Sequence, residues 1–62
     1  MKVNKDQLVK ITGNSIFEMM GHDTVTGKVN HVREDGFSFK CNETGCFETC
    51  DYDDGTIEVI TN

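Results

Sequence analysis

The stretch TVTGKVNHVR, residues 24–33, decides the fold of this chain. Its small and apolar residues alternate with polar ones, a period of two that is typical of a strand with one buried face. The alternating residues are Val25, Gly27 and Val29. Val32 falls out of this alternation, so we expect a bulge or bend near Asn30-His31. A bent strand of this kind lets a few strands curl into a barrel.

Turn sequences follow this strand at intervals of about ten residues. They are Glu34-Asp35-Gly36, Asn42-Glu43-Thr44-Gly45 and Asp53-Asp54-Gly55. The segments between the turns are predicted strands, namely Phe37–Cys41, Cys46–Tyr52 and Thr56–Ile60. Ile16–Met20 fits either a helical turn or a first strand. The spacing predicts a mostly β chain that forms a five-stranded antiparallel barrel.

The N-terminal segment Asn4–Ile11 is predicted to form a short helix. Its first residue is a good N-cap, and two apolar residues three positions apart, Leu8 and Ile11, lie on one helix face. We therefore expect a single domain over the whole chain. Residues 1–14 would form the helix and a linker, and residues 15–62 would form the barrel.

The pattern Gly27-Lys28-Val29-x-x-Val32, followed by Phe37-Ser38-Phe39, resembles the Gly-Lys-Val-x-x-Val core of KOW and Tudor-like small barrels. The resemblance covers less than half of the chain and implies a Src-homology-type (SH3-like) barrel. KOW modules that contact RNA tend to be basic, whereas this chain is acidic, so we carry over the fold and not the RNA function. A nucleic-acid-binding module of this kind would use Lys28, Arg33, Phe37 and Lys40.

Length and composition exclude several functional classes. A chain of 62 residues has a thin core and little room for a substrate pocket, so we expect no enzyme and no cofactor. It holds no run of about 18 apolar residues, so we expect no association with a membrane. Its first ten residues contain several polar side chains and no apolar h-region, unlike a secretory signal. We therefore expect a cytoplasmic protein, and an odd number of cysteines agrees with a reducing compartment.

The cysteine pattern Cys41-x4-Cys46-x3-Cys50 suggests a metal site, because zinc prefers four Cys or His ligands. His31 or His22 would supply the fourth ligand. The strand pairing favours another interpretation, because a four-residue loop after Cys41 directs all three thiols into the core. The facing pairs would be Cys41 with Cys46, Phe39 with Glu48, and Phe37 with Cys50. We prefer buried thiols, with zinc and a Cys41–Cys46 disulfide as alternatives.

The net charge of −5 is distributed unevenly. Residues 1–33 carry five Lys or Arg against three acids, whereas residues 34–62 carry one lysine against eight acids. An acidic half repels phosphate and attracts basic surfaces, so direct nucleic-acid binding is disfavoured. Aromatic residues interleave with the acids where they are densest, a composition typical of interaction hot spots. The predicted partner-binding residues are Glu48, Asp51, Tyr52, Asp53, Asp54 and Glu58.

Three other patterns have a simpler structural explanation. Asp51-x-Asp53-Asp54-Gly55 resembles a calcium loop only in part, because Thr61 stands where such a loop needs a glutamate. His22 and His31 lack the partners of a catalytic triad, so we interpret them as surface or turn residues. The pair Met19-Met20 is expected in the core, because few other residues are available to fill it.

Three functional hypotheses follow, in order of preference. The first is a stand-alone acidic binding module that masks the basic, nucleic-acid-binding surface of another protein. We expect such a module to be an inhibitor that a phage or mobile element encodes and that acts on a host protein in the host cytoplasm. The second is a KOW-like nucleic-acid-binding module. The third is an accessory or structural subunit that is completed by self-association of an open sheet edge.

Overall fold

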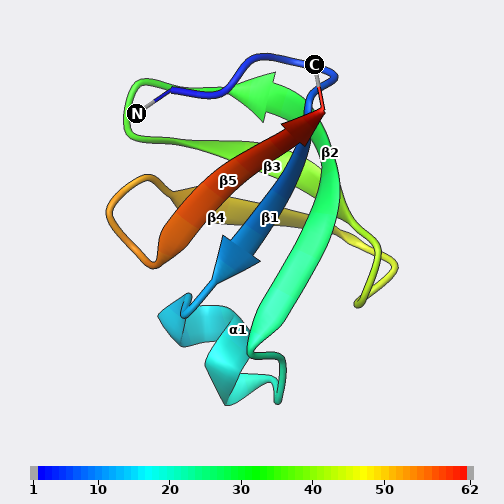
Figure 1. The fold of residues 1–62 in the computed structure, drawn as a ribbon, viewed down its shortest axis with the longest axis vertical. Coiled ribbons are helices and arrows are strands. Elements are labelled where there is room, and N and C mark those ends of the chain that lie inside the picture. Colours follow the sequence, from blue (N-terminus) through cyan, green and yellow to red (C-terminus); the bar gives the residue numbers. More distant parts are fainter. Residues whose placement is uncertain (1, 62) are drawn as a thin grey trace.

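The computed structural model describes residues 2–61, which form one antiparallel sheet with a short helix at one end (Figure 1). The elements are β1 (Leu8–Thr12), α1 (Ser15–Met19), β2 (Thr24–Val32), β3 (Gly36–Cys41), β4 (Phe47–Asp51) and β5 (Thr56–Thr61). The strands lie in the order β4-β3-β2-β1-β5. The prediction of a mostly β chain with five antiparallel strands is confirmed.

Strand β2 lies at the centre of the sheet and joins its two halves. Its first residues pair with β1 and its later residues pair with β3. The register of the second pairing shifts between Val29 and His31, which confirms the predicted irregularity near Asn30-His31. The long strand is visibly curved in Figure 1, so its two neighbours diverge in direction.

Gly27 lies where the two pairings of β2 overlap, opposite Val9 on one side and Cys41 on the other. A Cβ atom at this position would collide with the Lys40 carbonyl oxygen and would lie 2.6 Å from a carbon of the Phe39 ring. Glycine is therefore required for the close approach of β3 to β2, and this constraint is steric rather than conformational.

The predicted helix over Asn4–Ile11 is wrong, because this part of the chain contains strand β1. Val9 and Ile11 are buried while Lys10 between them is exposed, which is the period of a strand. β1 is hydrogen-bonded to β2 on one side and to β5 on the other. These partners, distant in sequence, outweigh a local helical preference that is marginal at this length. The segment assigned to a helix and linker, residues 1–14, thus contributes a central strand.

The only helix among residues 2–61 is α1, in the segment that fitted either a helical turn or a strand. It buries Phe17, whereas Met19 and Met20 are 89% and 49% exposed, so their assignment to the core is wrong. A five-residue helix at the end of a sheet has one inward-facing position, and Phe17 fills it. Within the described part of the chain, no helix has the length and apolar character needed to cross a membrane.

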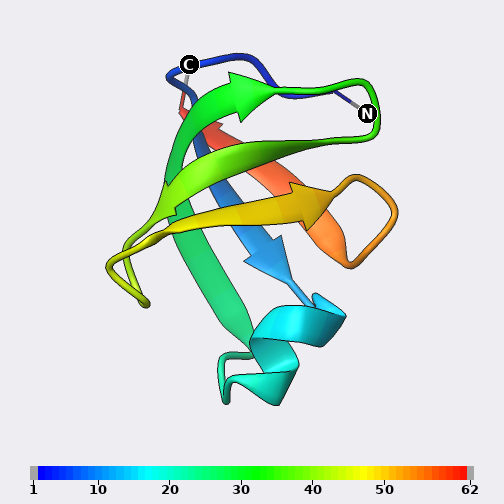
Figure 2. The same cartoon turned by 180° about the vertical axis from the view of Figure 1, so that it is seen from behind.

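The sheet curls because its two edge strands are consecutive in sequence. Four residues connect β4 to β5, and such a connection reaches at most about 18 Å. The edges of a flat five-stranded sheet would lie about 19 Å apart, and this connection also turns. Figures 1 and 2 show the resulting curl, which brings β4 and β5 towards each other. Within residues 2–61, however, the sheet contains no β4–β5 ladder.

The core lies inside this curl and is built around three aromatic rings. Phe39 contacts Phe17 and Phe37 with ring centroids 5.8 and 5.7 Å apart, and Phe37 also contacts Tyr52 at 5.7 Å. The remaining buried apolar residues are Val3, Val9, Ile11, Val25, Val29, Cys41, Cys50 and Ile57. Because the core contains few residues, each of them contributes a large fraction of the free energy of unfolding.

Gly27→Ala is expected to destabilise the protein by about 3 kcal/mol or more, because the added methyl group cannot fit against the β3 backbone. Urea unfolding followed by circular dichroism measures the change. Gly21→Ala is the matched control: its Cβ has open space, and only the positive φ of 92° costs about 1–2 kcal/mol. Equal stability of the two variants would contradict the steric role of Gly27.

Candidate functional site

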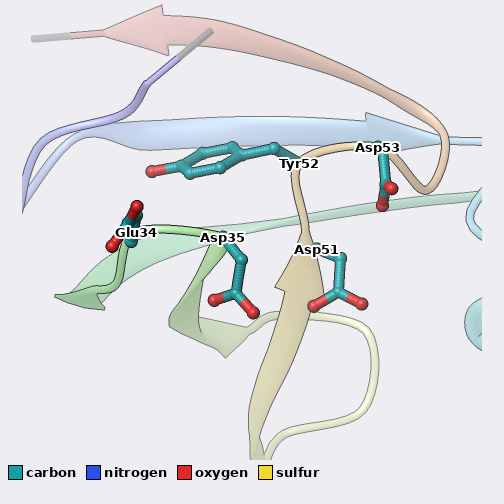
Figure 3. A pocket seen from close by; sticks show the side chains of 5 residues that line it. All are labelled: Glu34, Asp35, Asp51, Tyr52 and Asp53. Atoms are coloured by element: carbon teal, nitrogen blue, oxygen red, sulfur yellow. The ribbon is translucent and has the colours of Figure 1, made fainter.

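Acidic side chains from two turns surround a depression of about 350 Å³ on one side of the sheet (Figure 3). Its lining residues are Glu34, Asp35, Asp51, Tyr52 and Asp53, and we call this site the acidic depression. The carboxylates of Asp35, Asp51 and Asp53 point to the same side in Figure 3. The four acids come from the β2–β3 turn and from the end of β4.

The pairing of β3 with β4 brings the two turns together. Gly36 is the register partner of Asp51, so the residue before Gly36 lies beside the residue after Asp51. The Tyr52 backbone N–H donates to the Asp35 carbonyl oxygen at 3.0 Å, which fixes this contact. The half-buried Tyr52 ring packs against Phe37, and its hydroxyl accepts a long hydrogen bond of 3.5 Å from the Val3 N–H. The floor of the depression is therefore anchored to the core.

One cation partly neutralises the acidic depression. Arg33 forms ion pairs of 3.6 Å with Asp35 and 3.7 Å with Asp51. Exposed pairs of this kind contribute little to stability, but they hold the two carboxylates side by side. Among residues 2–61 no ion pair involves Glu34 or Asp53. The site is thus an exposed patch with four carboxylates and one guanidinium, and its potential is negative.

The structure brings together only part of the predicted partner-binding set. Asp51, Tyr52 and Asp53 line the acidic depression, whereas Glu48 and Glu58 do not. Glu48 is half-buried opposite Phe39, and Glu58 faces Lys10 across the β1–β5 pair.

Glu34 and Asp35 belong to the acidic depression but were absent from the predicted set. The signal was present in the sequence, because pairing Phe37 with Cys50 necessarily places the Glu34-Asp35 turn beside Tyr52. That pairing is confirmed, as are the predicted pairs of Phe39 with Glu48 and of Cys41 with Cys46. The local pattern indicates only a chain reversal at this turn, and its two charges join those at the end of β4 through the β3–β4 register.

Asp54 has a structural position rather than a place in the depression. Its carboxylate accepts hydrogen bonds from the Ser15 N–H at 3.0 Å and from the Ser15 hydroxyl at 2.7 Å. The backbone hydrogen bond first, and the hydroxyl second, lower the pKa of the Asp54 carboxyl below its ordinary 3.8. The carboxylate therefore ties the β4–β5 turn to the start of α1.

The three cysteines are free, and they differ in burial. Cys41 and Cys50 are buried as predicted, but Cys46 is exposed, so its assignment to the core is wrong. Cys46 precedes β4, outside the alternation that directs Cys50 inward. The Cys41–Cys46 disulfide considered from the sequence is also absent.

The thiol positions do not fit one metal ion. Cys50 faces Phe37, four residues before Cys41 on β3, so the two buried thiols lie about 13 Å apart along the sheet. Burial raises the pKa of the Cys50 thiol to about 11, so it does not form a thiolate readily. His31 is exposed opposite Ser38. Among the residues that the structure describes, no three His, Cys, Asp or Glu side chains are placed to hold a metal ion.

Comparisons with known proteins add no family to this description. No protein-family model matches the chain, and neither curated proteins nor solved structures give a significant match. The functional interpretation therefore depends on the shape, charge and contacts of the surfaces described above.

Asp54→Asn is expected to lower the melting temperature at pH 7, because it removes a charged acceptor from the Ser15 N–H and hydroxyl. The pKa of Asp54 is depressed by folding, so its stabilisation is complete above about pH 5 and is lost as the pH falls below 3.8. The difference from the unmodified protein should therefore shrink between pH 7 and about pH 2.5. Thermal unfolding at both pH values tests this, with Asp53→Asn as the control expected to change little at either.

Proposed function

We propose that this chain is an acidic protein-binding module whose acidic depression occupies a basic surface of another protein. The convergence of four carboxylates from two turns around one anchored tyrosine carries the proposal. Lys2, Lys5 and Lys10 form no ion pair with these carboxylates among residues 2–61, so Arg33 alone neutralises part of the patch. The patch is free to attract lysines and arginines of a partner.

The chemistry of the patch suits recognition by charge and shape. Long-range attraction raises the rate of association with a basic surface, and the fixed carboxylates select the orientation of docking. Tyr52 adds an aromatic surface with little conformational freedom to lose, which is the usual composition of a hot spot. A partner whose basic surface normally binds nucleic acid would be masked by this contact. We place such a module in the cytoplasm, as an inhibitor of the kind that phages and mobile elements encode.

The proposed scaffold is a Src-homology-type barrel related in fold to KOW and Tudor-like modules. Three features support it: the strand order, the bent strand β2 shared by both halves of the sheet, and the curl that brings β4 towards β5. A barrel of this type presents its turns at the ends of the strands, where the acidic depression lies.

A second candidate is a nucleic-acid-binding module, favoured by one row of side chains across three strands. Lys28 faces Lys40 in the β2–β3 pair, and Lys40 faces Phe47 in the β3–β4 pair with its Nζ 5.0 Å from the ring centroid. Like charges directly opposite destabilise a sheet, so this pair would favour an anionic ligand. Two of the four residues expected to contact nucleic acid are poorly placed for it. Phe37 is buried, and Arg33 forms ion pairs with Asp35 and Asp51.

The third hypothesis, a subunit completed by self-association, concerns the free edges of β4 and β5. A net charge of −5 on each copy opposes this association. Sedimentation at two protein concentrations separates it from the first two hypotheses, since only a self-associating chain changes its apparent mass.

Reversing two charges of the acidic depression, Glu34→Lys with Asp53→Lys, is expected to weaken binding to a basic peptide by about tenfold or more in about 50 mM salt. These two acids are chosen because they do not pair with Arg33. The probe is a labelled synthetic peptide of Lys, Arg, Gly and Ser, followed by fluorescence anisotropy. The salt dependence of binding should also become shallower, because fewer charges meet.

The matched control is Asp23→Lys with Glu58→Lys, which changes the net charge from −5 to −1 just as the test variant does but lies outside the depression. If both variants lose the same affinity, net charge and not the acidic depression governs binding, and the proposal is refuted. Titration of the unmodified protein with labelled single-stranded DNA tests the second candidate, since a phosphate binder weakens steeply as salt rises.

A further inference from the structure

Helix α1 and its C-cap residue, Met20, present an apolar face to solvent that the core does not use. Ile16, Met19 and Met20 are 53%, 89% and 49% exposed, and we call these three residues the methionine face. At about 100° per residue, they fall within one arc of about 100° on the helix surface. Phe17 lies beyond one end of this arc and is the only α1 side chain that is buried. The three exposed side chains therefore form one contiguous patch.

Single apolar residues are common on protein surfaces, but a group of three is not. In a chain with so small a core, these side chains would add more stability if they were buried. Methionine side chains are unbranched and polarisable, so a patch of this composition adapts its shape to different apolar partners. Figures 1 and 2 show α1 at one end of the molecule, projecting beyond the strands. A bound partner can therefore reach the methionine face without displacing any strand.

The charged residues near the methionine face indicate the charge of the partner that could bind there. Ser15 and Glu18 lie next to Met19 on the helix surface, and Ser15 holds the ionised Asp54 carboxylate at 2.7 Å. From Ile11 to Gly27 the chain contains no Lys or Arg. The methionine face thus has acidic neighbours, and the chain on either side of α1 adds no Lys or Arg to it between residues 11 and 27. A second copy of this chain, or an anionic surface, would bring like charges together there, whereas a basic segment would not.

The methionine face is also continuous with the acidic depression through the β4–β5 turn. Asp53 lines the depression, and its neighbour Asp54 is bound to the first residue of α1. One partner segment that crosses this turn would meet carboxylates first and the apolar patch next.

We propose that the methionine face is an anchoring site for an apolar side chain carried by the same basic segment that the acidic depression attracts. The partner is thus a segment in which lysines or arginines flank leucine or phenylalanine. This inference rests on the proposed function and specifies its partner. The acids guide and orient the segment, and the apolar contact slows its dissociation.

Two labelled synthetic peptides of equal length and equal positive charge test the inference by fluorescence anisotropy. One carries Leu and Phe between its Lys and Arg residues, and the other carries Ser at the same positions. The unmodified protein should bind the apolar peptide about tenfold more tightly than the serine peptide. Met19→Ser with Met20→Ser should abolish this preference and leave the affinity for the serine peptide, and its salt dependence, unchanged.

Ile60→Ser is the matched control, because Ile60 is 46% exposed on β5 and lies outside α1. It should retain the preference for the apolar peptide. The three substituted side chains are exposed, so unfolding curves should show that each variant remains folded.

The outcomes separate the two proposals. Equal binding of both peptides by the unmodified protein, or an unchanged preference in the methionine variant, overturns the anchoring role while the acidic depression remains supported. Failure to bind the serine peptide at low salt overturns the proposed function itself. Sedimentation that shows a dimer of the unmodified protein and a monomer of the methionine variant would assign the face to a second copy and overturn the inference.

Discussion

The side chain of Asn14 joins the helix, the β4–β5 turn and strand β4 at one buried point. It is 2% exposed, and its Oδ1 accepts hydrogen bonds from the N–H groups of Ile16 and Phe17, which caps α1. Its Nδ2 donates to the Asp54 carbonyl oxygen at 3.1 Å and contacts the Cys50 sulfur at 3.5 Å. A buried amide is tolerated only when its polar atoms are satisfied, so these segments must meet as they do.

The backbone of the β4–β5 turn also approaches the end of β1 closely beside Asn14. Gly55 has a positive φ of 98°, and a Cβ atom there would lie 2.7 Å from the Thr12 carbonyl oxygen. The β4–β5 turn therefore lies close against the end of β1, next to the last pair of the β1–β5 ladder. Both candidate surfaces depend on the same turn, since it carries Asp53 into the acidic depression and fixes the border of the methionine face.

The acidic depression and the methionine face would contribute to binding in different ways. Carboxylates in a solvated depression attract a basic segment over distances of about 8–10 Å at moderate salt, but each exposed contact is weak. An apolar patch acts only at contact but excludes water, and it therefore lengthens the lifetime of a complex. Their placement on either side of one rigid turn lets a short segment engage both. A chain of 62 residues has room for surfaces of this kind and little room for an enclosed site.

The sequence alone determined the features that depend on local pattern. The alternation in residues 24–33 identified β2 and its irregularity, and the four-residue loop after Cys41 fixed the β3–β4 register. Strand period and loop length are short-range properties, so they can be derived without knowing the rest of the fold. The same register places three of the six predicted partner-binding residues at the acidic depression. Asp51 is the last residue of β4, and Tyr52 and Asp53 follow it directly.

Only the tertiary structure decided which segments meet across long distances in sequence. Leu8–Thr12 became a strand because β2 and β5 satisfy its backbone on both sides, and no local pattern contains those partners. Asp54 lies outside the acidic depression, and its carboxylate accepts a hydrogen bond from the hydroxyl of Ser15, 39 residues away in the sequence. Met19 and Met20 were left outside because the end of the curled sheet accepts a single side chain from α1. In each case the outcome depends on contacts between segments far apart in the sequence, which form only when the strands and the helix are assembled.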